Sequence, residues 1–184
     1  MKVLVFLGSR YGNSEVYREA CIEVADWISN NNHSLVYGGN ANGLMGVLAN
    51  RVLENGSEAI GVMPGYLKGI EDIHLGLTDF IETETMQERK DKMRELSDIC
   101  IAIPGGPGTM EEITEAYSLY IVGQNTSPCI VYNKDNYYDN LRNMYDKMLE
   151  KGFLTQDNRK KLLFSDNFEE INKFIEENQN EKYI

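Results

Sequence analysis

The stretch DICIAIPGGPGTMEEITEAY, residues 98–117, joins an apolar segment to a glycine-rich loop and then to a segment of helical period. The run 98–106 has the length of a buried strand, and residues 109–123 repeat apolar side chains at the spacing of one helix face. A strand, a short loop and a helix in this order form the repeating unit of a parallel α/β sheet. This stretch therefore predicts such a unit, with its loop at the carboxyl end of the strand.

The rest of the chain repeats the same alternation. Further strands are expected at 2–8, 34–39, 58–64, 79–83, 128–133 and 161–165, and further helices at 14–31, 43–54, 85–97, 136–151 and 167–179. Parallel strands need such crossover helices, which cover both faces of the sheet. The sequence therefore predicts an α/β fold: a Rossmann-like, doubly wound parallel sheet of about six to seven strands, flanked by helices. We expect residues 1–184 to form a single domain.

The amino-acid composition and the net charge of the chain indicate which classes of binding partner are unfavourable. The chain is 42% apolar and 26% charged, which is typical of globular proteins, and its net charge is 18 − 29 = −11. Without an excess of Lys and Arg we expect neither nucleic acid nor an anionic membrane surface as a partner. The first apolar run, Val3 to Leu7, is too short for a secretory signal, and no run is long enough to span a membrane.

The cysteines and histidines carry no sign of a metal site. Cys21, Cys100 and Cys129 each lie among apolar neighbours, which favours buried free thiols in a reducing, cytoplasmic environment. His33 and His74 are far apart and have no Cys or His at ligand spacing. We therefore expect no metal.

Several strands are followed by loops of small residues. These loops read GSRYGN at 8–13, YGGNANGLMG at 37–46, PGYL at 64–67 and PGGPGT at 104–109. A doubly wound sheet binds its ligand at this edge. One glycine-rich turn can serve tight turning alone, but several on the same edge favour a ligand the size of a nucleotide. The loops match neither the dinucleotide fingerprint nor the P-loop.

The remaining interpretation is an anion site at the start of a helix. Backbone N–H groups of the first helical turn attract phosphate, and here they belong to Gly105, Gly106, Gly108 and Thr109. The hydroxyl of Ser9, after the first strand, can add a further donor.

Three glutamates follow this loop and differ in helical phase. If the apolar face packs on the sheet, Glu111 and Glu115 are expected to face solvent, whereas Glu112 lies at the flank of the packed face. Two interpretations of Glu112 remain open. It can close a capping box, with Thr109 as N-cap and Glu112 at the third helical position, or it can act in the site.

A second segment, 84–96, places an arginine on an apolar stripe. Arg89 shares its helix face with Met86 and Met93, whereas Lys92, Arg94 and Glu95 are expected to lie off that face. An inward arginine needs an anionic partner because burying an unpaired charge is costly. That partner is either a structural carboxylate or a ligand.

Four blocks in fixed order resemble the LONELY GUY family of cytokinin-activating phosphoribohydrolases, often labelled lysine decarboxylases. The hallmark P-G-G-x-G-T-x-x-E is present as Pro104 to Glu112, and M-x-x-R-K as Met86, Arg89 and Lys90. The G-S after the first strand and the Y-G-G…G-L-M-G block at 37–46 also match. The resemblance runs from the first strand to at least residue 133.

The resemblance implies hydrolysis of the N-glycosidic bond of an adenosine 5′-monophosphate, plain or N6-substituted, to free base and ribose 5-phosphate. It implies that Arg89 and Glu112 are the catalytic pair, that no cofactor takes part, and that the protein is a homodimer. No residue marks a pyridoxal-phosphate lysine, so the decarboxylase label has no support. The residues it implies for substrate binding are Gly8, Ser9, Gly38, Gly39, Met86, Lys90, Gly105, Gly106, Gly108 and Thr109.

Three positions depart from or vary within the family pattern. Asn40 replaces a third glycine, Gln87 stands where histidine is frequent, and Pro107 occupies the variable position of the motif. The first two put the base preference in doubt. Two other functions remain open: a non-catalytic carrier or sensor of a nucleotide or cofactor, and a transferase that would exchange bases.

Overall fold

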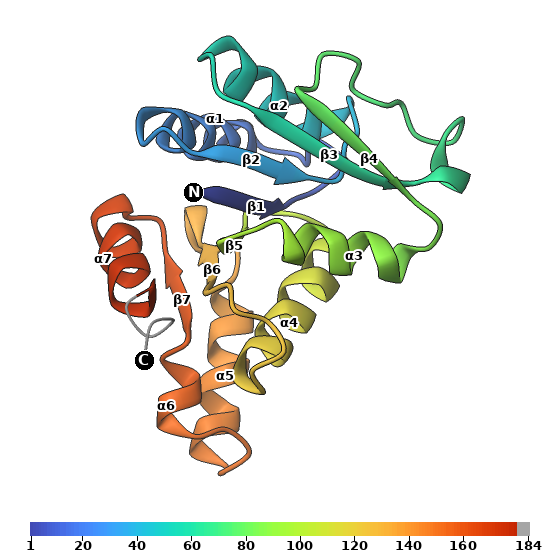
Figure 1. The fold of residues 1–184 in the computed structure, drawn as a ribbon. Helices are drawn as coiled ribbons and strands as arrows, with labels where there is room; N and C mark the ends of the chain where they lie inside the picture. Colours follow the sequence, from blue (N-terminus) through green and yellow to red (C-terminus); the bar gives the residue numbers. More distant parts are fainter. Residues whose placement is uncertain (180–184) are drawn as a thin grey trace.

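The computed structural model describes residues 1–179, in which seven parallel strands form one sheet in the order β4-β3-β2-β1-β5-β6-β7 (Figure 1). Residues 180–184 of the expected domain lie outside the described residues. The strands are β1 Lys2–Phe6, β2 Ser34–Tyr37, β3 Ala59–Pro64, β4 Asp79–Thr83, β5 Ile99–Ala102, β6 Cys129–Tyr132 and β7 Leu162–Ser165. The helices are α1 Glu15–Asn30, α2 Gly43–Glu54, α3 Met86–Glu95, α4 Pro107–Ile121, α5 Asp139–Glu150, α6 Gln156–Arg159 and α7 Phe168–Gln179.

The strand order confirms the doubly wound sheet. The chain starts in the middle with β1, moves to one edge through β2, β3 and β4, and then returns to place β5, β6 and β7 on the other side. The direction of winding reverses between β1 and β5, so the loops that follow these two strands leave the sheet side by side. Ligands of such sheets bind at this switch point, beyond the carboxyl ends of the strands.

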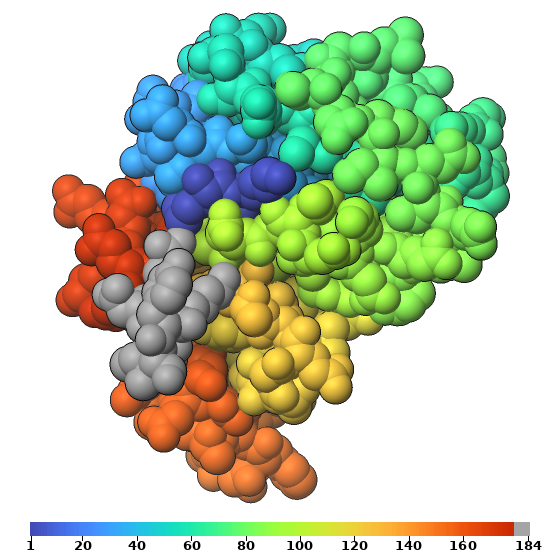
Figure 2. Space-filling model, viewed as in Figure 1, coloured from blue at the N-terminus to red at the C-terminus, as the bar shows by residue number. Residues whose placement is uncertain are grey.

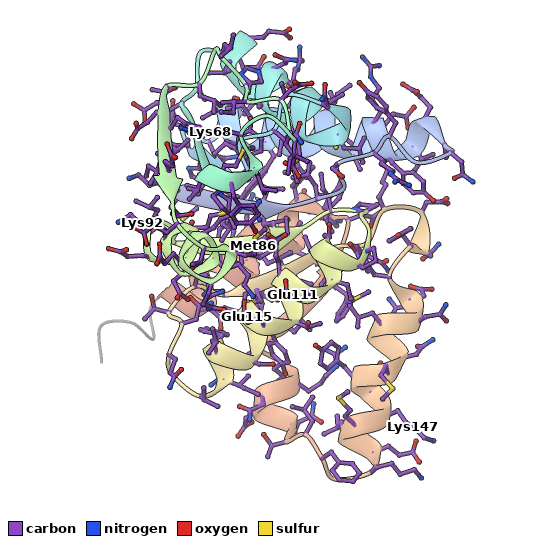
Figure 3. All side chains as sticks on the ribbon, turned by 90° about the vertical axis from the view of Figure 1, so that its right-hand side faces the viewer. Lys68, Met86, Lys92, Glu111, Glu115 and Lys147 are labelled. Carbon is purple, nitrogen blue, oxygen red and sulfur yellow. The ribbon has the colours of Figure 1, made fainter. Side chains whose placement is uncertain are left out.

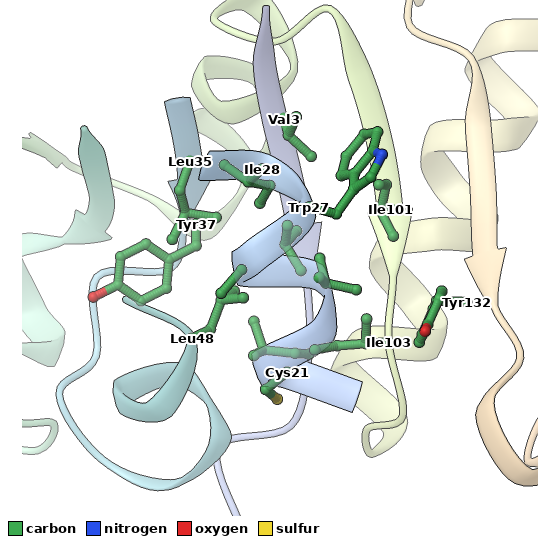
Figure 4. Packing of buried hydrophobic residues seen from close by; sticks show 14 of the residues in the cluster. Val3, Cys21, Trp27, Ile28, Leu35, Tyr37, Leu48, Ile101, Ile103 and Tyr132 are labelled. Atoms are coloured by element: carbon green, nitrogen blue, oxygen red, sulfur yellow. The ribbon is translucent and has the colours of Figure 1, made fainter. Parts of the chain in front are cut away.

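Two apolar layers hold the helices on the sheet. On one face α1, α2 and α7 pack around buried residues such as Ile28 and Leu48 (Figure 4). On the other face α3, α4 and α5 cover a second cluster that includes Met93 and Tyr117. The central strands are buried on both faces, which explains their nearly continuous apolar sequences.

The observed ends of β5 and α4 differ from the expected ones, because glycine and proline lie between these two elements. β5 ends at Ala102, before the expected end at 106, because the chain turns at Pro104 into the glycine loop. α4 begins at Pro107 rather than at 109, since Gly106 in extended conformation caps it and proline suits the first helical position. The short helix α6 had no sequence signal, whereas the strand expected at 161–165 is confirmed as β7. Among the described residues, no helix has the length and apolar character needed to cross a bilayer.

Candidate active site

A cavity of about 670 Å³ opens at the carboxyl edge of the sheet, where the loops after β1, β2, β3 and β5 meet. This size suits a small-molecule ligand. The residues expected from the sequence that line it are Gly8, Ser9, Gly38, Met86, Arg89, Gly105, Gly106, Gly108, Thr109 and Glu112. Gly39 and Lys90 were also expected at the ligand, but neither lines the cavity.

The start of α4 supplies one end of the cavity. Gly106 is the N-cap and Pro107 follows it, so Thr109 is the third helical residue, and no side chain caps the helix. The capping box expected between Thr109 and Glu112 is therefore wrong, because the N-cap is Gly106, three residues before Thr109. The N–H groups of a first helical turn have no intrahelical acceptor, so those lining this cavity are suited to an anion.

Two glycines bring this loop against the end of β1. A Cβ atom on Gly105 would lie 2.8 Å from the backbone nitrogen of Gly8, a distance that real Cβ atoms do not reach. The hydroxyl of Tyr137 donates a hydrogen bond of 2.6 Å to the carbonyl of Gly105. This loop is thus fixed from both sides, and only glycine fits at position 105.

Arg89 reaches into the cavity from α3. Thr85 caps this helix, since its hydroxyl accepts a hydrogen bond of 3.1 Å from the backbone of Glu88. The guanidinium of Arg89 donates through Nε to the carbonyl of Val62 (3.0 Å) and through Nη1 to the Sδ of Met86 (3.2 Å) and Oε1 of Glu112 (3.2 Å). These contacts confirm that Arg89 lies on an inward face with an anionic partner.

Both side chains of this ion pair are buried, and that of Glu112 is only 10% exposed. Burial raises the pKa of its carboxyl above the ordinary value, and the charge of Arg89 opposes that rise without cancelling it. The side chain does not cap α4, so its carboxylate faces the cavity at Arg89. A buried carboxylate with a raised pKa and a positioned guanidinium are groups of the kind found in active sites.

A second layer of ion pairs ties α3 to α4, which lie side by side (Figures 1 and 2). The ammonium of Lys90 bonds Glu111 at 2.6 Å and Glu115 at 3.0 Å, and Arg94 bonds Glu115 at 3.0 Å and also pairs with Asp91. Figure 3 shows Glu111 and Glu115 on α4, on the side toward the helix that carries Met86.

Two expectations about these charges are therefore wrong. Glu115 is not free in solvent but is 26% exposed and paired with Lys90 and Arg94, and the side chain of Arg94, expected off the buried face, is only 8% exposed. Glu111 is half exposed, yet it too is paired. Burial by itself acts to lower the pKa of Lys90, but its hydrogen bonds to Glu111 and Glu115 outweigh burial and raise that pKa. Helical phase misjudged these residues because it counted only apolar neighbours.

Asn40, a departure from the family pattern, is buried under the loop that follows β3. Its Nδ2 donates to Oε2 of Glu71 (2.9 Å), and its Oδ1 accepts from the backbone of Asn42 (2.7 Å). The preceding Gly39 has a φ of +80° and packs against Gly61 rather than lining the cavity. Gln87, another departure, is exposed and bonds Asp91, outside the cavity.

Sequence reasoning missed several lining residues. Arg10, Tyr11, Tyr17, Met45, Leu67, Glu71 and Tyr137 also line the cavity. Arg10, Tyr11, Met45 and Leu67 lie within the small-residue loops at 8–13, 37–46 and 64–67 that the sequence marks as the ligand edge. Tyr137 follows β6 and had no local signal, because its contact with Gly105 depends on the packing of the two strands.

Comparisons with known proteins identify relatives of this chain. A family model described as "Possible lysine decarboxylase" matches residues 45–175. A cytokinin riboside 5′-monophosphate phosphoribohydrolase of Arabidopsis thaliana is 33% identical over 176 residues, covering 96% of this chain and 83% of that protein. A probable enzyme of the same name from Oryza sativa subsp. japonica is 37% identical over 158 residues, covering 86% of this chain and 71% of the relative.

Solved structures share the fold at lower identity. The molybdenum cofactor binding protein of the phototrophic bacterium Rippkaea orientalis superposes with a TM-score of 0.67 at 18% identity, over 96% of this chain and 95% of that one. At this identity the likeness shows the fold alone. The family model and the relatives above 30% identity show more: the chain belongs to the LONELY GUY family, whose curated members are named cytokinin riboside 5′-monophosphate phosphoribohydrolases and whose family model is described as a possible lysine decarboxylase.

Proposed function

We propose that the protein hydrolyses the N-glycosidic bond of adenosine 5′-monophosphates, plain or N6-substituted, and releases free base and ribose 5-phosphate. The observation that carries this proposal is the buried Arg89–Glu112 pair, which lies in the same cavity as the unpaired N–H groups of α4. One end of the cavity thus suits a phosphate and the middle offers a carboxylate to a sugar. The names of the curated relatives support the same reaction.

The phosphate is held by the loop Gly105–Thr109, where the helix N-terminus favours an anion. Ser9 and Arg10 line the cavity beside this loop and add a hydroxyl and a positive charge. Fixing the phosphate also fixes the ribose at the other end of the same molecule. Positioning then accounts for part of the rate enhancement without covalent catalysis.

Glu112 acts on the ribose. Cleavage of the bond between C1′ and the base leaves positive charge on the sugar, and a carboxylate close to that carbon stabilises it. The same carboxylate binds the ribose hydroxyls and orients or deprotonates the attacking water. Water adds its oxygen to C1′ while the bonding electrons leave with the base.

Arg89 favours the ionised form of Glu112, against the effect of burial, and contacts the nucleotide. Its Nε is anchored on the carbonyl of Val62, which leaves the remaining N–H groups to face the carboxylate and the ligand. The guanidinium offsets negative charge on the phosphate or on the departing base. Met86 lines the base side. Lys90, which does not line the cavity, acts by keeping α3 and α4 in register.

The experiment is a chromatographic search for free base. The purified protein is incubated separately with N6-isopentenyl-AMP, AMP and an unphosphorylated nucleoside, with the Glu112→Gln variant in parallel. Base released only from monophosphates, and only by the parent protein, is the expected result.

The other functions predict different outcomes. Tight binding with intact nucleotide after long incubation would replace the proposal with a carrier. Exchange of the base when labelled free base is added would indicate a transferase.

We also infer a homodimer, as the family resemblance implies, and a reducing cytoplasmic location, since all three cysteines are buried free thiols. Light scattering of the purified protein measures the mass, and the monomer mass is 21.0 kDa. A species of that mass at working concentration would contradict the dimer. Fractionation of cells followed by immunodetection tests the location.

A further inference from the structure

The strand order sets the direction in which a nucleotide lies, provided the proposed function holds. The sheet runs β3-β2-β1-β5, so the loops that follow these strands line the cavity in the same order. If the phosphate binds after β5 and the ribose lies at Glu112, the base lies over the loops after β2 and β3. Arg89 marks this transition, because it spans from Glu112 to the carbonyl of Val62 in β3.

The base end of the cavity combines apolar side chains with one carboxylate. Met45, Leu67 and Met86 line it with flexible apolar surface suited to the faces of a purine ring. Among the described lining residues, Glu71 is the carboxylate that comes from the loops after β2 and β3, since Glu111 and Glu112 belong to α4. An acceptor at this end has no role in binding phosphate and instead repels it.

Glu71 is held in place by a buried side chain. Asn40 is only 4% exposed and donates through Nδ2 to Oε2 of Glu71 (2.9 Å). Asn40 is itself fixed by the backbone N–H of Asn42, and its own carbonyl accepts from the hydroxyl of Tyr37 (3.3 Å). Within residues 1–179 the second oxygen of Glu71, Oε1, has no hydrogen-bond partner, so an oriented acceptor remains for a ligand.

We propose that Glu71 accepts a hydrogen bond from the exocyclic N6–H of a 6-aminopurine, with Asn40 as its positioning residue. A 6-oxopurine has a carbonyl oxygen with lone pairs at that position. This oxygen and the carboxylate of Glu71 are both acceptors, so neither regains the hydrogen bond that it loses when water leaves. An N6-monosubstituted base retains one N–H and is accepted, whereas an N6,N6-disubstituted base is not. The pair therefore determines base specificity, and its negative charge disfavours a nucleotide bound in the reverse direction.

The test measures binding, so that it does not depend on turnover. Dissociation constants are determined by calorimetry in the Glu112→Gln background for AMP against IMP, and for N6-methyl-AMP against N6,N6-dimethyl-AMP. In the second pair the dimethyl compound has N–CH3 in place of the one remaining N–H. With Glu71 present, we expect the compound lacking the N–H to bind about tenfold or more weakly, the usual effect of leaving such a site unpaired.

Glu71→Gln is the informative variant. Because Asn40 donates to one side-chain oxygen, the amide turns its NH2 toward the base and becomes a donor. The AMP to IMP preference is expected to collapse to about one or to invert. Asp72→Asn is the matched control, since Asp72 is the neighbouring carboxylate, is exposed and does not line the cavity. Asn40→Ala is expected to reduce the preference in part.

The outcomes separate this inference from the proposed function. Collapse of both ratios in Glu71→Gln, with both retained in Asp72→Asn, supports the inference. Unchanged ratios in Glu71→Gln, equal collapse in Asp72→Asn, or no discrimination by the parent background would overturn it. If the parent protein discriminates in binding yet releases no base, the hydrolase proposal fails and this inference stands. If none of the four nucleotides binds, both fail.

Discussion

The pattern T-x-x-E occurs at the start of two neighbouring helices and has a different role in each. In α3 the hydroxyl of Thr85 accepts from the backbone of Glu88, and the carboxylate of Glu88 accepts from the backbone of Glu84 (3.0 Å). This arrangement satisfies free N–H groups at the helix start. In α4 the same pattern, Thr109 to Glu112, makes no cap, and Glu112 instead pairs with Arg89.

The preceding residues cause the difference. α4 begins with Gly106 and Pro107, which start the helix before Thr109 and remove the need for a side-chain cap. Its first N–H groups therefore remain available to a ligand. Glu112, which makes no capping hydrogen bond, faces the cavity instead. At α3 the threonine is the N-cap and the glutamate is exposed. A glycine and a proline before this T-x-x-E sequence thus remove its capping role and leave its glutamate at the cavity.

The largest effect is expected when the charge is removed from each of the two glutamates, Glu112 and Glu88, in turn. Glu112→Gln is expected to lower turnover by about 100-fold to 10,000-fold, the usual effect of losing a positioned acid or base, with nucleotide affinity largely retained. Glu88→Gln removes one charge from the same pattern and is expected to leave turnover within twofold. Initial rates of base release measure both.

Near-parental turnover in Glu112→Gln would show that its charge has no part in the reaction. A large loss in Glu88→Gln would contradict the assignment of that residue to a cap. Circular dichroism spectra of both variants establish that neither effect comes from unfolding.

Arg89 carries the next largest expected effect. Arg89→Ala removes the partner of Glu112 and a cation that lines the cavity, so both the Michaelis constant and the turnover should worsen, with kcat/KM lower by about 100-fold. Lys92→Ala is the matched control, because Lys92 is a cation of the same helix that pairs with Glu95 outside the cavity. Unchanged kinetic constants in Arg89→Ala would leave the residue with a structural role alone.

Most of the fold and the residues at the centre of the cavity could be predicted from the sequence. Particular residues show why the remaining contacts could not. The apolar strands and the inward position of Arg89 follow from local periodicity, so they were predictable. The pairing of Glu115 with Lys90 and Arg94 depends on how α3 lies against α4, which helical phase does not describe. The capping interpretation of Glu112 failed for a different, local reason, because Gly106 and Pro107 start α4 before Thr109.

The loops after the strands also show how far a local sequence pattern can predict the cavity. Their glycines marked the correct edge of the sheet, but the residues that complete the cavity come from positions without a pattern. Glu71 reaches it through a side-chain bond with Asn40, and Tyr137 through a bond with Gly105. Contacts between distant loops arise from the sheet order, and no single stretch of sequence encodes them.

A pH titration sharpens the difference between a buried and a capping glutamate. Burial raises the folded-state pKa of Glu112 above its ordinary value of 4.5. The protonated carboxyl therefore contributes stability that is fully present below pH 4.5 and is lost as pH rises through the raised folded-state pKa. We expect the unfolding free energy of the parent protein to fall relative to Glu112→Gln above pH 4.5. Urea denaturation of both proteins between pH 4 and 8 measures this difference, and parallel curves would contradict it.

The smallest expected effect distinguishes the two threonines as caps. Valine keeps the shape of threonine but loses its hydroxyl oxygen, so Thr85→Val removes the hydrogen bond to the backbone of Glu88 and should cost about 1 kcal/mol of unfolding free energy. Thr109→Val removes no cap, because Gly106 holds that position, and should cost less than half as much. Its effect should fall instead on the Michaelis constant, since the hydroxyl lines the phosphate end of the cavity. Equal losses of stability in urea denaturation would mean that Thr109 does cap α4, and that the glycine and proline before it do not decide how the pattern is used.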